Sequence, residues 1–338
     1  MIDSASLGFP LCANKYSDFL TYEENSFEWA EAFGLLDDGR SRKAYARLHS
    51  GRFGHYTYWY ARPPQTQLGT DLIGWLFLWD DNYPDGQNRR EPARQAQVNK
   101  FYLQVFDSGN ADLCDSPYAR SLVDLKRRME VLSNPRWIAR FRDTLRDYFE
   151  GCLKEVLFRT AHIDPNFSEY RDFRHQSVGA YPVLDFMEIA TGSILEEDVY
   201  RSSLFQDFRK TSSWILALTN DYFSLLKEEF EKDSFNAILA IMHENGLTRD
   251  AACRVFAFEH LKEVTRLHEL EGQINLKWGL ESAALKYAFA ARSWMQGNWD
   301  WSQKTPRYES KLLNEEYLGS AVSIGQAGRA FAASENQS

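Results

Sequence analysis

Residues 203–232 read SLFQDFRKTSSWILALTNDYFSLLKEEFEK, and this stretch decides the fold class. Apolar side chains recur through it at roughly helical spacing, with lysine and glutamate between them, which is the pattern of an amphipathic helix. The apolar positions are Leu204, Phe208, Ile215, Leu218, Tyr222, Leu225 and Leu226. Further helical patterns cover residues 71–81, 139–158, 234–244, 249–275 and 280–296. The best strand candidate is only the short aromatic run at residues 55–60, so the sequence predicts an all-α protein.

No domain boundary shows itself along the chain. The predicted breaks between helices fall at residues 82–86, 133–136, 164–168 and 296–306. None of these breaks is a long linker of glycine, serine and proline. We therefore expect one helical domain over residues 1–318. Residues 319–338 are rich in alanine, glycine and serine, and we expect them to form a loosely ordered tail.

Charge and hydropathy exclude several classes of function. Lys and Arg number 39 and Asp and Glu number 48, which gives a net charge of −9. We expect no nucleic-acid partner, because binding of nucleic acid depends on basic side chains that neutralise phosphates. The most apolar stretch, residues 72–79, is far shorter than the ~20 residues of a membrane-spanning helix, so we expect no integral membrane segment. The chain also opens without a secretory signal pattern, and a cytoplasmic location is the expectation.

The cysteines and histidines give no sign of a metal or disulfide site. Four cysteines lie far apart and form no CxxC pair, so we expect reduced thiols. His260 and His268 share a predicted helix with several glutamates, but no HExxH motif is present. We predict that both histidines lie on a solvated, charged helix face.

An acidic cluster follows a strongly apolar helical stretch, in the sequence FLWDDNYPD at residues 77–85. Asp80 and Asp81 come at the C-terminal end of that predicted helix, where the helix dipole disfavours anions. Burial of such carboxylates is costly unless they are paired or bind a cation. Oxygen ligands suit Mg²⁺, which commonly takes one or two carboxylates together with substrate phosphate oxygens and water. Taken alone, the cluster could also be a solvated helix end.

A second set of oxygen ligands lies within residues 203–232. Asn220, Ser224 and Glu228 follow one another at intervals of four, so each lies only about 40° further around the helix than the last. An amide oxygen, a hydroxyl and a carboxylate therefore stack on one face, where they can hold one octahedral metal ion. The alternative on these residues alone is the polar stripe of an amphipathic helix.

Together, the two sites resemble those of class I terpene synthases (terpene cyclases) of microbial type. Asp80, Asp81 and Asp85 match the family's DDxxxD motif, and the Asn-Ser-Glu motif follows about 140 residues later. Three further matches are in register. The first is Arg174, which lies 46 residues before Asn220, where the family has a diphosphate-sensing arginine. The second is the segment GNWDWSQKTPRY at residues 297–308, and the third is Phe9-Pro10 with Asn14. The resemblance spans residues 8–310.

The resemblance implies a single-domain class I terpenoid synthase fold, a helical bundle around a central apolar cavity. It implies an isoprenyl diphosphate substrate, with farnesyl diphosphate favoured, and cyclisation to a sesquiterpene hydrocarbon or alcohol with release of diphosphate. Three Mg²⁺ ions are expected as cofactors, with Mn²⁺ as a substitute. Their ligands would be Asp80, Asp81, Asp85, Asn220, Ser224 and Glu228. A homodimer is also compatible with the family.

The same resemblance assigns the substrate-binding side chains. Charge-assisted and hydroxyl donors to the diphosphate would be Arg174, Lys227, Arg307 and Tyr308. The aromatic content of 15% fits a cavity whose rings stabilise passing positive charge. We expect Phe53, Phe77 and Trp301 to line that cavity and Trp79 to lie in the core. Diphosphate at Arg307 and Tyr308 is expected to order the loop at residues 296–306.

Two departures from the family pattern stand out. Pro84 precedes Asp85 and should distort the end of the acidic motif, which makes Asp85 the ligand least fixed by the resemblance. Ser177 and Val178 stand where the family often has Asp or Thr followed by Gly. Without the resemblance, Arg174 would be assigned to a surface ion pair with Asp172 or Glu169.

Three alternatives remain open at this stage. A diterpene synthase acting on geranylgeranyl diphosphate would carry the same motifs. A chain-elongating prenyltransferase shares the fold but normally carries two aspartate-rich motifs. A non-catalytic helical scaffold could bind a cation or a partner through its acidic patch, but it does not explain the basic residues that stand in register with the two metal motifs.

Overall fold

The computed structural model describes residues 19–110, 116–231 and 233–308, and within these ranges it contains helices and no strand. The helices are α1 (Phe19–Ala32), α2 (Gly39–Leu48), α3 (Ser50–Thr57), α4 (Pro63–Asn82), α5 (Pro92–Ser108), α6 (Pro117–Leu132), α7 (Pro135–Ala161), α8 (Phe167–Ser177), α9 (Ala180–Thr191), α10 (Glu197–Arg201), α11 (Ser203–Glu231), α12 (Ala237–Asn245), α13 (Arg249–Trp278) and α14 (Ala283–Ser302). A π-helical turn, η1 (Tyr83–Gln87), and a 3₁₀ turn, η3 (Pro306–Tyr308), complete the set. The all-α prediction is confirmed.

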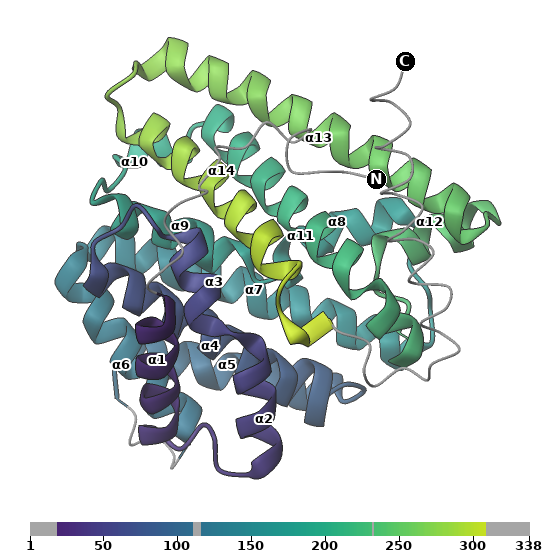
Figure 1. Ribbon diagram of the computed structural model, residues 1–338, viewed down its shortest axis with the longest axis horizontal. Coiled ribbons are helices and arrows are strands. Elements are labelled where there is room, and N and C mark those ends of the chain that lie inside the picture. The colour runs from purple at the N-terminus through teal and green to yellow at the C-terminus, as the bar shows by residue number, and fades with distance from the viewer. Residues whose placement is uncertain (1–18, 111–115, 232, 309–338) are drawn as a thin grey trace.

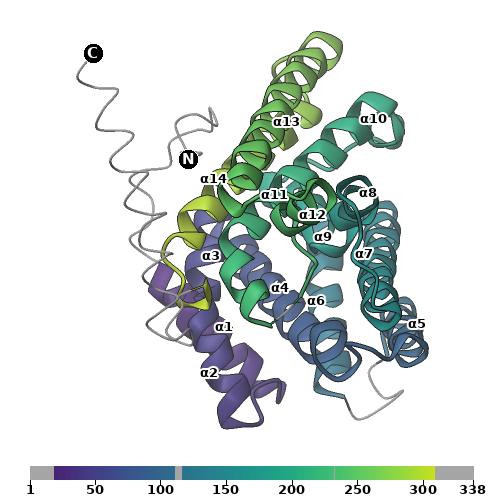
Figure 2. The same cartoon turned by 90° about the vertical axis from the view of Figure 1, so that its right-hand side faces the viewer.

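Helix α9 lies at the centre of the bundle. It packs against α4, α7, α11 and α14, while the other helices surround this group (Figures 1 and 2). Every side chain from Ala180 to Ala190 is buried. A helix that is buried on all sides carries no amphipathic stripe, and this explains why the sequence pattern did not reveal α9.

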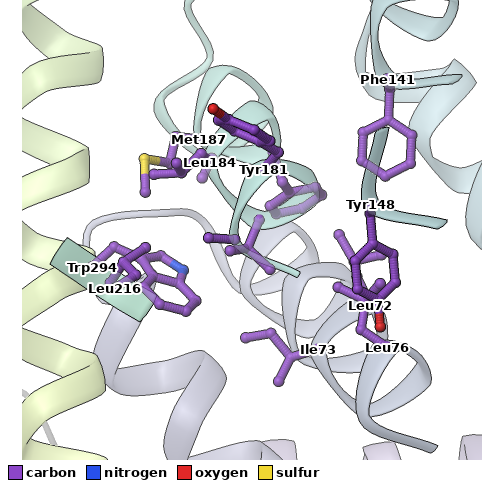
Figure 3. Close-up of a cluster of buried hydrophobic side chains, with 14 of the residues drawn as sticks. Leu72, Ile73, Leu76, Phe141, Tyr148, Tyr181, Leu184, Met187, Leu216 and Trp294 are labelled. Carbon is purple, nitrogen blue, oxygen red and sulfur yellow. The ribbon is translucent and has the colours of Figure 1, made fainter. Parts of the chain in front are cut away.

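The core of the bundle is aromatic and borders a cavity. Figure 3 shows side chains from five helices facing one another, namely Leu72, Ile73 and Leu76 of α4, Phe141 and Tyr148 of α7, Tyr181, Leu184 and Met187 of α9, Leu216 of α11 and Trp294 of α14. Trp79 is fully buried and stacks on Phe149 with 4.4 Å between ring centroids, so its prediction as a core residue is confirmed.

Of the four predicted breaks, three coincide with helix ends and one is partly wrong. Helix α4 ends at Asn82, where the break at residues 82–86 was predicted, and the π-helical turn η1 follows it directly. Breaks occur as predicted between α6 and α7 and between α7 and α8. The break predicted at residues 296–306 is wrong in its first half, because α14 continues to Ser302. Residues 55–60, the best strand candidate, instead form the end of α3 and the turn after it.

Some predictions fall outside the described residues, among them the tail at residues 319–338 and the match at residues 9–14. Cys152 and Cys253 are free thiols, whereas Cys12 and Cys114 lie in the ranges that are not described. Among the described helices, none is long and apolar enough to cross a membrane.

Candidate active site

One cavity runs between α4, α7, α11 and α14, and its lining changes character along each helix. On α4 it is lined by Ile73, Leu76 and Phe77 and then by Asp80, with Asp85 following in η1. On α11 it is lined by Leu216 and then by Asn220, Ser224, Lys227 and Glu228. Because both helices pass from apolar to polar lining residues, the cavity has an apolar part and a charged end.

Asp80 lies at this charged end without a cationic partner in direct contact among the described residues. Its carboxylate accepts a hydrogen bond of 3.1 Å from the Tyr148 hydroxyl and lies 3.8 Å from the Cys152 thiol. Burial raises the pKa of Asp80 well above its usual range, and the nearby Asp85 and Asp81 carboxylates add to the shift. Asp80 is partly buried, and a carboxylate in this environment is a poor anion unless a cation binds beside it.

The other two aspartates of the motif are each paired with an arginine. Asp81 accepts a bidentate pair from Arg307, with N–O distances of 2.7 and 2.9 Å. Asp85 lies 3.0 Å from Arg159. Burial raises the pKa of both carboxyls, but the facing arginine together with further nearby cations, Lys227 among them, holds each pKa below its usual value. Of the three aspartates, Asp80 and Asp85 line the cavity.

The three oxygen donors of α11 face the same end of the cavity. The Asn220 side-chain oxygen accepts from Arg174 at 2.8 Å, and its amide nitrogen donates to the Tyr308 hydroxyl at 2.9 Å. The buried Ser224 hydroxyl makes no hydrogen bond of ordinary length with any described residue. Glu228 accepts a 2.6 Å hydrogen bond from Asn236, and burial, reinforced by Asp221, raises its pKa to about 8.

Arg174 is buried within this polar end rather than on the surface. It donates to Asp221 at 2.9 and 3.2 Å, to Glu155 at 3.2 Å and to Asn220 at 2.8 Å. The surface ion pair considered from the sequence alone is therefore wrong. Glu169, one of the partners considered there, instead caps the N-terminus of α8.

Rings form the wall next to the charged end. Phe53 stacks on Trp301 with 4.0 Å between centroids and an interplanar angle of 7°, and Phe77 lies about equally far from both, at 6.1 and 5.9 Å. All three line the cavity. The Arg307 guanidinium lies over the Phe77 ring at 4.7 Å, so the ring wall and the basic end are in contact.

One polar face of the site was missed by the sequence analysis, and it belongs to α7. Tyr148, Cys152, Glu155 and Arg159 follow at intervals of four, three and four, which puts them on one side of the helix. Tyr148 and Cys152 contact Asp80, while Glu155 and Arg159 contact Arg174 and Asp85. The spacing was visible in the sequence, but polar residues at helical spacing mark a solvated face more often than a site.

His260 was also misassigned. It was predicted on a solvated face, but its side chain is 1% exposed and neither ring nitrogen has a hydrogen-bond partner among the described residues. Burial lowers its pKa to about 4. It packs near Phe256, away from the cavity.

The donor set of the charged end fits a hard divalent cation. Within the described residues, no three His, Cys, Asp or Glu side chains converge into a cage made by protein alone. The site instead offers a carboxylate destabilised by burial at Asp80, a buried Ser224 hydroxyl that makes no hydrogen bond of ordinary length within the described residues, and a second destabilised carboxylate at Glu228. Such incomplete oxygen sets are typical of Mg²⁺ sites that share the ion with substrate phosphates and water.

Comparison with known proteins agrees with this geometry. The family model described as terpene synthase family 2, C-terminal metal binding, matches residues 71–266. The chain is 27% identical to a germacrene A synthase from Nostoc punctiforme, over 89% of this chain and 93% of the relative. It is 27% identical to a (+)-T-muurolol synthase from Roseiflexus castenholzii, described as cyclising (2E,6E)-farnesyl diphosphate, over 88% and 91% of the two chains.

Solved structures support the fold. The crystal structure of germacradien-4-ol synthase from Streptomyces citricolor superposes with a TM-score of 0.76 at 22% identity, covering 90% of this chain and 100% of the other. Wild-type cucumene synthase gives a TM-score of 0.74 at 21% identity, covering 88% and 99%.

Proposed function

The chain belongs to terpene synthase family 2, and from this membership we propose that it cyclises farnesyl diphosphate to a sesquiterpene hydrocarbon or alcohol and releases diphosphate. The observation that carries the proposal is the single cavity that joins a charged, oxygen-rich end to a ring-lined apolar part. A prenyl diphosphate has the same two halves. The farnesyl chain length is supported by the relatives named above, one of which is described by that substrate.

Divalent metal binding is a property of the family, and we propose Mg²⁺ as the metal, with Mn²⁺ as a substitute and three ions per site. Asp80 and Asp85 on one side and Asn220, Ser224 and Glu228 on the other would hold the ions, with Asp81 assisting beside Asp80. When bound, the metal supplies Lewis-acid stabilisation of the charge that develops on the diphosphate. The proposal is supported by the destabilised carboxylates and by the buried Ser224 hydroxyl, which makes no hydrogen bond of ordinary length with the residues that the structure describes.

Four basic or hydroxyl side chains are proposed to bind the diphosphate. Arg174, Lys227, Arg307 and Tyr308 all line the charged end of the cavity. Arginine is suited to phosphate oxygens because its planar fork donates two parallel hydrogen bonds. Arg307 pairs with Asp81 in the structure, so the guanidinium is already desolvated and oriented toward the acidic cluster.

The ring wall is proposed to guide the carbocation. Phe53, Phe77 and Trp301 line the cavity, and aromatic rings attract positive charge without offering a nucleophile. Their packing also excludes water, which protects a reactive cation from premature capture. Arg307 lies over the Phe77 ring at 4.7 Å and also lines the cavity, so the residue proposed to bind diphosphate is in direct contact with the ring wall.

Incubation with defined substrates tests the proposal. Purified protein is mixed with geranyl, farnesyl or geranylgeranyl diphosphate and Mg²⁺, and the organic extract is analysed by gas chromatography with mass spectrometry. Cyclic C15 products from farnesyl diphosphate support the proposal, whereas cyclic C20 products would identify a diterpene synthase and longer linear diphosphates a prenyltransferase. Unchanged substrate in every incubation would contradict catalysis. The homodimer and the cytoplasmic location stay predictions.

A further inference from the structure

The outer surface of the bundle carries a groove beside helix α13. Figures 1 and 2 both show α13 along the outer edge of the molecule, where it packs on α11, α12 and α14. The groove has a volume of about 680 Å³ and is lined by residues of α8, α11 and α13. Trp214 of α11 lines this groove, whereas Leu216 and Asn220 of the same helix line the cavity. The groove is therefore separate from the candidate active site.

Large apolar side chains are exposed toward both ends of α13. Val255, Phe258 and Leu261 in its first half are 40%, 67% and 50% exposed. Leu276 near its end and Leu280 just after it are 88% and 73% exposed. Five of the eleven large apolar side chains that are exposed in the described part of the chain thus lie on or next to this one helix. Exposed apolar residues that gather in this way mark an interaction surface, whereas scattered ones do not.

The exposed positions of α13 follow the spacing of a helix–helix contact. They recur at intervals of four and three residues, which is the repeat by which one helix packs along another. The positions are Phe258, Lys262, Thr265, Glu269, Gly272 and Leu276. The first four of them also line the groove. The groove and this strip of side chains therefore fit a second helix that lies along α13.

Gly272 lies in this strip although nothing in the described part of the chain requires a glycine there. It stands within α13, so no turn needs it, and a Cβ atom built at this position would have open space around it. Glycine inside a helix costs about 1 kcal/mol relative to alanine. A residue without a side chain suits a place where another element comes close to the backbone.

The charges of α13 are complementary to those of a second, antiparallel α13. Within one chain, Lys262 lies 3.4 Å from Glu259, and Arg266 lies 3.5 Å from Glu269. Exposed pairs of this kind contribute at most about 1 kcal/mol, so they do not hold the charges in place. A parallel copy would bring Lys262 next to the same lysine and Glu269 next to the same glutamate. An antiparallel copy brings each lysine next to a glutamate instead.

From this pattern we propose that α13 and its groove form a homodimer interface, in which the α13 helices of two copies pack antiparallel about a twofold axis near residue 266. Lys262 then lies beside Glu269 of the partner subunit, and the symmetry makes this contact twice. Phe258 lies between Gly272 of the partner subunit and Leu276 of the partner subunit, where the missing side chain leaves space for the ring. The proposal does not depend on the reaction proposed above.

The first experiment measures the mass of the full chain in solution. Sedimentation velocity over a range of protein concentrations is expected to show a dimer that dissociates on dilution. Phe258→Glu should weaken the dimer by about 10- to 100-fold, because large apolar residues near the centre of an interface carry much of its affinity. Leu276→Glu provides a second test at a side chain that is 88% exposed and therefore not needed for folding. Val131→Glu on α6, 83% exposed, is the matched control and should leave the dimer unchanged.

Gly272→Gln separates a role between copies from a role within the helix. Glutamine is the better helix former, so the thermal stability of this variant at low protein concentration should equal or exceed that of the wild type. Its side chain would occupy the space proposed for the partner subunit's Phe258, so the dimer should weaken by about 10-fold or more. An unweakened dimer in Gly272→Gln would contradict the close approach of the two helices.

A charge exchange tests the antiparallel arrangement itself. Lys262→Glu is expected to weaken the dimer, and the addition of Glu269→Lys is expected to restore it. In the double variant, each exchanged residue has a like charge beside it in its own helix, at Glu259 or Arg266. Recovery can therefore come only from pairing between two copies.

Three results would overturn the proposal. A protein that stays monomeric at every concentration has no such interface, whatever else binds in the groove. A dimer that is unaffected by both Phe258→Glu and Leu276→Glu forms through another surface. A dimer that is weakened by Lys262→Glu but not restored by the double variant does not pair its α13 helices in an antiparallel manner. Circular dichroism of each variant verifies that the comparison is made between folded proteins.

Discussion

Replacing Arg174 by alanine is expected to destabilise the protein strongly as well as to abolish turnover. The arginine is 8% exposed and donates four hydrogen bonds, two of them to Asp221 and one to Glu155. Its removal leaves two buried carboxylates with fewer donors. Loss of one partner of a buried ion pair typically costs about 3–5 kcal/mol.

The structure places this cost toward the lower end of that range. Asp221 keeps the Tyr170 hydroxyl at 2.7 Å and the Ala237 amide at 2.9 Å, and Glu155 keeps Arg159. Those donors continue to solvate both carboxylates, so we expect the free energy of unfolding of Arg174→Ala to fall by about 3 kcal/mol.

Urea unfolding followed by circular dichroism measures the loss. The matched control is Arg136→Ala, since Arg136 pairs with Glu196 while the two side chains are 68% and 74% exposed. Exposed pairs contribute at most about 1 kcal/mol, so the control should lose far less stability. Equal, small losses of stability in the two variants would refute the buried hydrogen-bond network of Arg174. Substantial residual turnover by Arg174→Ala would refute the proposal that Arg174 binds the diphosphate.

Three further outcomes are expected. Gly151→Ala should lower stability by roughly 1–3 kcal/mol in thermal unfolding, because its methyl would lie 2.6 Å from the Ser177 amide nitrogen; an unchanged melting temperature would contradict the close packing of α7 on the end of α8. His260 has a folded pKa of about 4 against an ordinary value of 6.5, so its contribution to stability is present above pH 6.5 and is lost as the pH falls toward 4, by roughly 3 kcal/mol in full. His260→Leu should therefore lose less stability than the wild type between pH 7.5 and 5 in urea unfolding, and parallel losses would count against burial of the neutral ring. Asn220→Ala should reduce turnover of farnesyl diphosphate by about 100-fold or more with an unchanged circular dichroism spectrum, since even outer-shell partners of a metal cost about 10- to 100-fold. Near-normal rates would remove Asn220 from the proposed metal site.

The sequence by itself determined the features that depend on local periodicity. The long helix α11 follows from apolar residues at helical spacing, and the same spacing puts Asn220, Ser224 and Glu228 on one face before any tertiary contact is known. Part of the aromatic wall could also be predicted from the sequence, because Phe77 lies one helical turn before Asp80. Both residues are on α4, and both line the cavity. These inferences need only the geometry of a single helix.

The tertiary structure decided how those faces meet. Arg307 and Asp81 pair across 226 residues, and no local pattern could select that partner over other carboxylates. The polar face of α7 becomes part of the site only because residues of α4 and α8 contact it, as Asp80 contacts Tyr148 and Arg174 contacts Glu155. The end of α14 shows the same principle, since a break was predicted from residue 296 onward, yet the helix passes through Gly297 to Ser302. A side chain there would lie 2.5 Å from the Tyr56 carbonyl oxygen, so the glycine serves the close approach of α3 and α14 rather than a turn. Such contacts join residues far apart in the chain, and helical periodicity carries no information about them.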